Sequence, residues 1–151
     1  AMPPLSQRRH GRRTPQDETE PTPTNLAGLF FFLNLPIDEE QDPWQYLALL
    51  ALNLEEEIEK DPIWPILETL AEEEIDRELE IELPDLRDLL PDIEDPLHFL
   101  LRRFGRVALT PAHVDVFFSL AAHPIEIRLS GLDRDPGWLL PAGRHVAFHF
   151  D

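Results

Sequence analysis

The sequence predicts an α+β domain in which N-terminal acidic helices pack on a small C-terminal antiparallel sheet. Up to residue 104 the apolar residues recur mostly at helical spacing, whereas from residue 105 onward they alternate with polar ones, as in half-buried strands. The first 24 residues are instead rich in Pro, Thr, Gln and Arg. We therefore expect a disordered arm over residues 1–24 and a single domain over residues 25–151, with a helical part (25–104) and a sheet part (105–151).

The domain opens with its most apolar stretch, LAGLFFFLNLPI, residues 26–37. This stretch has about half of the roughly 20 residues that a membrane-spanning helix needs, so we expect a buried helix and no membrane span. The three consecutive phenylalanines at 30–32 cannot all point to one narrow helix face. At least one of them is therefore expected to stay exposed.

Three Asp-Pro pairs predict the starts of the following helices. Asp42, Asp61 and Asp95 each place an N-cap acceptor before a proline whose missing N–H costs nothing in the first helical turn. Gln45, three residues after the first of these aspartates, completes a capping-box pattern. The expected helices cover residues 43–60, 62–75 and 96–104.

The ends of these helices are marked by fewer signals than their starts. Gly105 is placed to end the third helix as its C′ residue. Between the second and third helices, residues 77–86 alternate Leu and Ile with Glu. This pattern fits either a strand or a helix that frays into a linker, and both alternatives stay open.

Beyond Gly105, proline and glycine turns separate four short apolar runs. Val114, Val116 and Phe118 share one face of their run, which the acidic helices are expected to cover. Neighbouring Phe117 falls on the opposite face, because successive side chains of a strand alternate between its faces. The predicted strands are RVAL (106–109), HVDVFF (113–118), IEIRL (125–129) and HVAFHF (145–150).

Charge is concentrated in the helical part of the chain. The formal net charge is −17, and residues 38–96 alone hold 22 acidic groups against three basic ones, a net charge of −19. Such a field repels phosphate backbones, so we expect no nucleic-acid binding and, if this surface binds at all, a basic protein. The other interpretation is a solvated helix face that keeps the protein in solution.

The sequence carries no motif of a common enzyme class. It contains no glycine-rich phosphate loop, nucleophile elbow or zinc-protease helix, and no cysteine. The missing cysteine fits a reducing compartment, and no secretory signal follows the N-terminal arginines, so we expect a cytoplasmic protein.

Histidines in the predicted strands are the remaining candidates for chemistry. His113 and Asp115 fall on one face, as do His145 and His149, and such pairs can bind zinc or iron. The same alternation places polar residues on the solvated face of any half-exposed sheet. We favour this second interpretation and expect no bound metal, no cofactor and no catalytic activity.

The loop before the last strand is rich in charge. The tripeptide Asp133-Arg134-Asp135 and the nearby Arg144 either line a catalytic pocket beside Trp138 or hold the loop through arginine-to-carboxylate or arginine-to-carbonyl hydrogen bonds. We favour the structural interpretation, with Trp138 as the apolar anchor of the loop.

Four segments of the sequence carry a family resemblance: AGLFFFLNLP (27–36), DPIWPILETLA (61–71), GRVALTPAHVDVFFSL (105–120) and GLDRDPGWLLPAGRHVAFHFD (131–151). They resemble, in the same order, parts of bacterial proteins encoded beside phage-tail-like contractile injection systems. The signature lies in residues 131–149, and the family carries no catalytic motif. The acidic residues 72–96 have no counterpart, and LLPA at 139–142 stands where an aromatic residue and a second glycine turn are expected.

This resemblance implies a non-enzymatic structural or assembly component that contacts sheath, tube, baseplate or tape-measure proteins. The alternative is an acidic adaptor or inhibitor, comparable to immunity proteins or nucleic-acid mimics, that binds a basic partner through its acidic segment. The residues expected to form either the signature or the contact surface are Phe117, Asp133, Asp135, Trp138, Arg144, His145 and His149.

Overall fold

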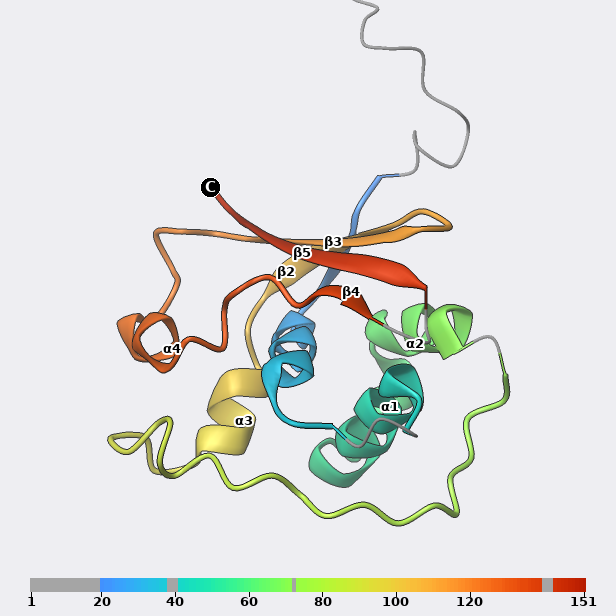
Figure 1. Cartoon of the computed structure of the whole chain (residues 1–151), viewed down its shortest axis with the longest axis horizontal. Helices are drawn as coiled ribbons and strands as arrows, with labels where there is room; N and C mark the ends of the chain where they lie inside the picture. Colours follow the sequence, from blue (N-terminus) through green and yellow to red (C-terminus); the bar gives the residue numbers. More distant parts are fainter. Residues whose placement is uncertain (1–19, 38–40, 72, 140–142) are drawn as a thin grey trace, which may run out of the picture.

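The computed structural model describes residues 20–37, 41–71, 73–139 and 143–151, and it confirms the α+β class. One five-stranded sheet forms a layer with the helices on one side of it (Figure 1). No helix among the described residues is both long and apolar enough to cross a membrane. The elements are β1 (Thr22–Thr24), η1 (Ala27–Asn34), α1 (Pro43–Leu54), η2 (Ile58–Lys60), α2 (Ile63–Ala71), α3 (Pro96–Leu101), β2 (Gly105–Leu109), β3 (His113–Phe118), α4 (Ile125–Ser130), β4 (Gly137–Leu139) and β5 (Arg144–Phe150).

The sheet is mixed, so the predicted antiparallel sheet is wrong. Its strand order is β1-β2-β3-β5-β4, and β3 and β5 run parallel while all other pairs are antiparallel. Parallel neighbours need a crossover connection, and here the chain from 119 to 143, which includes α4 and β4, supplies it. The parallel register places His113 opposite His145 and Phe117 opposite His149.

The run IEIRL, predicted as a strand, forms the short helix α4 instead. Pro124 occupies its N-cap position, and Gly131 ends it in the left-handed conformation with φ of 80°. Only Ile127 of its apolar residues is buried, whereas Ile125 and Leu129 expose 62% and 79% of their surface. Alternation over five residues does not distinguish a strand from a short helix that buries one side chain.

The predicted disordered arm is partly wrong, because its last residues join the sheet. Thr22–Thr24 forms the edge strand β1, paired with β2, and an edge position tolerates Pro23. Thr24 is buried, and its hydroxyl donates to Asp61 Oδ1 at 2.5 Å, which ties the sheet edge to the start of α2. The remainder of the predicted arm, residues 1–19, lies outside the described residues.

All three predicted helix caps are present. Backbone N–H groups donate to the Oδ1 atoms of Asp42 and Asp61 at 2.9 Å and of Asp95 at 3.3 Å. The predicted capping box at Gln45 is wrong: its side chain donates to Glu74 O and accepts from Asp76 N, both at 3.0 Å. Gln45 therefore fastens the chain that follows α2 onto α1.

The three helices end earlier than predicted, α2 at Ala71 instead of residue 75. α1 stops at Leu54 and α3 at Leu101, so Gly105 does not cap α3 but begins β2. A Cβ atom at Gly105 would lie 2.8 Å from Ala27 Cβ and 2.9 Å from Phe117 O. Close packing between η1 and the sheet accounts for this glycine.

The core is centred on the 3₁₀ helix η1, which lies between the sheet and helices α1 and α3 (Figure 1). All three phenylalanines at 30–32 are fully buried, so the expected exposure of one of them is wrong. The reason is that η1 has neighbours on several sides rather than one narrow face against the core. Phe31 stacks on Phe118 and meets Phe148 edge-on, with ring centroids 4.7 and 5.1 Å apart.

The segment between α2 and α3 has no regular secondary structure over its described residues, 73–95, and follows an extended path (Figure 1). It is a linker, neither the strand nor the fraying helix that its pattern allowed. Leu86 and Leu90 anchor it in the core, each with 1% of its surface exposed. Three other leucines of the segment remain exposed, namely Leu79, Leu83 and Leu89.

The outer face of the sheet as the candidate interface

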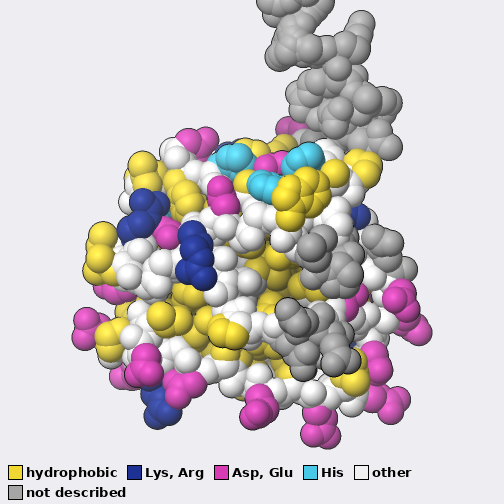
Figure 2. All heavy atoms as spheres, viewed as in Figure 1, with side chains coloured by type: hydrophobic (Ala, Val, Ile, Leu, Met, Phe, Trp, Pro, Cys, Tyr) yellow, Lys and Arg dark blue, Asp and Glu magenta, His cyan; other side chains and the backbone are white. Residues whose placement is uncertain are grey.

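The strands carry an aromatic and histidine-rich surface on the side away from the helices, which we call the outer face. Side chains alternate along each strand, so the residues between the buried ones point outward. Figure 2 shows histidine and apolar side chains gathered at this side of the molecule. The outer face includes Arg106 of β2, His113, Asp115 and Phe117 of β3, Trp138 of β4, and His145 and His149 of β5.

His149 is held in place by two neighbours on β3. Its Nε2 lies 2.8 Å from Asp115 Oδ1, and its ring stacks on that of Phe117 with centroids 4.7 Å apart and an interplanar angle of 20°. The side chain of His149 is nevertheless 45% exposed. The ring is thus oriented by the protein and remains available to a partner.

A second group on the outer face consists of three rings. His145 lies opposite both His113 and Trp138 in the register of the sheet. The ring centroid of His145 lies 5.4 Å from that of Trp138 and 5.9 Å from that of His113. Trp138 exposes 59% of its surface, so the residue predicted to anchor the loop is instead a surface side chain.

The outer face presents histidine and carboxylate groups in pairs. Asp115 pairs with His149 on one side, and His113 faces His145 on the other. Among the described residues, no group of three or more His, Cys, Asp or Glu side chains is placed to hold a metal ion. Zinc and iron sites in proteins use three or four such ligands, and the expected absence of metal stays a prediction.

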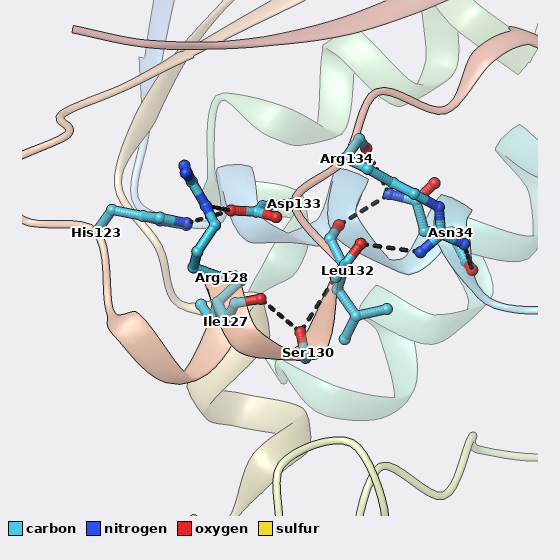
Figure 3. Close-up of polar contacts among 9 residues, drawn as sticks. Asn34, His123, Ile127, Arg128, Ser130, Leu132, Asp133 and Arg134 are labelled. Carbon is cyan, nitrogen blue, oxygen red and sulfur yellow. Dashed lines mark hydrogen bonds and ion pairs between the residues drawn. The ribbon is translucent and has the colours of Figure 1, made fainter.

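Asp133 is a structural residue in the loop between α4 and β4. Its buried carboxylate accepts hydrogen bonds from His123 Nε2 at 2.9 Å and from Arg128 Nε (Figure 3). The side chain of His123 is only 4% exposed. An arginine-to-carboxylate contact therefore holds the loop, but its arginine is Arg128 and not Arg134 or Arg144, and the sequence pattern assigned no role to Arg128 or His123.

The rest of the loop is fixed by further hydrogen bonds. Asp135 Oδ1 accepts from Phe148 N at 2.8 Å, and Arg144 Nη1 donates to Thr110 O at 2.6 Å, the predicted arginine-to-carbonyl contact. Asn34 Nδ2 donates to the carbonyl oxygens of Leu132 and Arg134 (Figure 3). No local pattern pointed to Asn34, because its partners lie about a hundred residues away along the chain.

Comparison with protein-family models, with curated proteins and with solved structures returned no match to this chain. The residues predicted to form the signature or the contact surface divide into two groups. Asp133, Asp135 and Arg144 hold the loop from within, whereas Phe117, Trp138, His145 and His149 lie on the outer face.

Proposed function

We propose that the protein is a non-enzymatic structural or assembly component of a phage-tail-like contractile injection system, and that it contacts particle proteins through its outer face. The supporting observation is the group of Trp138, His145 and His149 on the sheet, with Trp138 and His149 exposed and His145 half-buried, within the segment that carries the resemblance. The partners would be baseplate, sheath, tube or tape-measure proteins, met in the cytoplasm.

The composition of the outer face suits a protein contact. The core of a protein interface is enriched in aromatic residues and depleted of charge. Here Asp115 is the only acidic residue in the five strands, although the chain holds 30 acidic residues. Trp138 and Phe117 offer apolar ring surface, and the histidines add polar atoms at fixed positions.

The test is capture of injection-system proteins from a strain that produces such particles. We expect the wild-type chain to retain these proteins. The Trp138→Ala variant should lose most of them, with no change in its thermal midpoint. Leu129→Ala is the matched control, because Leu129 is 79% exposed but lies on α4, outside the outer face. If the wild-type chain retains no such protein, the proposed function is wrong; equal capture by both variants refutes the outer face as the contact.

A second candidate function is that of an acidic adaptor for a basic protein. It is favoured by the described linker, in which Leu79 and Leu83 expose 48% and 45% of their surface between glutamates at 78, 80 and 82. Apolar side chains framed by carboxylates suit a basic partner with an apolar centre. Binding through this linker should weaken steeply as salt rises, whereas binding through the outer face should change little.

A further inference from the structure

We propose that a cavity between the end of α3 and the β3–α4 turn binds a small organic anion, specifically a carboxylate attached to an aromatic body. The cavity has a volume of about 260 Å³, and α3 and α4 lie at the same end of the molecule (Figure 1). This site is separate from the outer face and independent of the proposed function. The residues that carry the inference are Arg102, Arg103, Phe104, Phe118, Ser119 and His123.

The lining of this cavity has the opposite charge to the rest of the protein. No carboxylate is among its lining residues within the described part of the chain, although the net charge is −17. Two other cavities show the contrast. Glu55, Glu57 and Asp61 line a cavity of about 480 Å³ together with Lys60 and Arg102, and four acidic side chains and Arg77 line one of about 390 Å³.

The two arginines of the cavity differ in their partners. Arg102 Nε donates to Glu55 Oε1 at 2.7 Å, so a carboxylate of the protein already neutralises it. Among the described residues, the side chain of Arg103 donates to a single backbone oxygen, that of Arg102 at 3.1 Å, and its guanidinium lies over the ring of Phe99 at 4.7 Å. No carboxylate among the described residues lies within ion-pair distance of Arg103.

Arg103 therefore offers a charge that the described structure does not balance. The residue is half-buried, and burial lowers the pKa of its guanidinium. This is the direction expected when a cation loses water without gaining an opposite charge. An anion bound beside it would supply charge-assisted hydrogen bonds of the kind that guanidinium groups form with carboxylates.

The neighbouring Asp133 does not oppose an anion at this place. Its carboxylate is shared between Arg128 and His123, so its negative charge is met within the protein. The same contact fixes the ring of His123, which lines the cavity beside Ser119. The Ser119 hydroxyl is a further hydrogen-bond donor available to a carboxylate.

Two phenylalanines set the chemistry of the remaining part of the ligand. Phe118 is buried and stacked between Phe31 and Phe150, with ring centroids 4.7 and 5.5 Å away, and it forms a rigid apolar wall. Phe104 also lines the cavity but exposes 59% of its surface. A ligand ring would cover this exposed phenylalanine. The volume is below the range of about 300–1,000 Å³ that drug-sized ligands occupy, which favours a small ligand.

The test uses 3-phenylpropanoate as the probe, followed by two-dimensional ¹H–¹⁵N NMR on the full chain. We expect saturable shifts confined to the amides around Phe104, Ser119 and His123. The alcohol 3-phenylpropanol, which lacks the charge, and acetate, which lacks the ring, should each bind at least about tenfold more weakly. Equal binding of the alcohol, or no saturable shift with the carboxylate up to about 20 mM, overturns the proposal.

Variants separate the site from a general effect of charge. Arg103→Gln should weaken binding of 3-phenylpropanoate at least about tenfold, and Arg103→Lys, which keeps the charge, should weaken it less. Arg87→Gln is the control: it changes net charge equally, but Arg87 lies on the linker with its side chain 83% exposed, paired with Asp85. If Arg103→Gln binds as tightly as Arg87→Gln, the cavity is not an anion site.

Discussion

On β3, Val114, Val116 and Phe118 point toward the helices and expose at most 4% of their surface, whereas Asp115 and Phe117 between them point outward and remain partly exposed. β5 repeats this contrast, with Phe148 buried and His149 exposed. The two faces come from the same strands and the same backbone hydrogen bonds. They differ because η1 and its phenylalanines cover one face, which we call the inner face, and no described element covers the other.

The difference has a consequence for energetics and function. On the inner face each side chain contributes by apolar burial, about 25 cal/mol per Å², and by aromatic packing. On the outer face the His149–Asp115 contact is solvent-exposed, and such pairs contribute at most about 1 kcal/mol. We expect the inner face to determine stability and the outer face to determine binding, and the substitutions below test this division in order of expected effect.

The largest effect is expected for Phe148→Ala on the inner face. Phe148 is 6% exposed and lies 5.1 Å from Phe31 and 5.9 Å from Phe118 between ring centroids. Removing the ring should lower the free energy of unfolding by about 3–5 kcal/mol, because a cavity remains in the core. Urea unfolding followed by circular dichroism measures this, and a loss below about 1 kcal/mol would contradict the central role of η1.

Gly28→Ala should disturb the close packing of η1, which covers the inner face, against α3. A Cβ atom at Gly28 would lie 1.8 Å from the carbonyl oxygen of Leu100, so η1 and α3 would have to separate. Overpacking of this kind costs about 1–3 kcal/mol or more. Gly137→Ala on β4 is the control, since no atom lies within 4 Å of its Cβ position and only the strain of its φ of 78° remains. Equal thermal midpoints for Gly28→Ala and Gly137→Ala would contradict this prediction, because they would mean that η1 and α3 can move apart at little cost.

Asp61→Ala tests the contact between the start of α2 and the edge strand β1. The carboxylate caps α2 through Ile63 N and accepts from the Thr24 hydroxyl of β1. Losing both contacts should cost about 1–2 kcal/mol. Asp42→Ala, which removes a cap without a link to the sheet, should cost less in the same urea experiment. The reverse order would mean that the Thr24 contact adds nothing.

His149→Ala should have the smallest effect on stability, within about 1 kcal/mol, because an exposed ring is removed. It should nevertheless reduce capture of the partner that the outer face binds. A large loss of stability, comparable with that of Phe148→Ala, would show that the outer face is covered in solution. Sedimentation velocity would then show whether a second copy of the chain covers it.

Local interactions explain what the sequence determined by itself. The three helix starts were predictable because an N-cap joins an aspartate to a backbone N–H two or three residues away. The inner row of Val114, Val116 and Phe118 was predictable because alternation within one strand fixes which residues share a face. The α+β class and the outward position of the three histidines of the outer face, His113, His145 and His149, follow from these two patterns.

Only the tertiary structure decided the features that depend on long-range contacts. The parallel pairing of β3 with β5 and the joining of β1 to the sheet each depend on neighbours distant in sequence. The same holds for the buried contact of His123 with Asp133 and for the cavity beside Arg103. Side-chain spacing along the chain carries no information about which strands become neighbours, because register and pairing are set by the packing of the whole core.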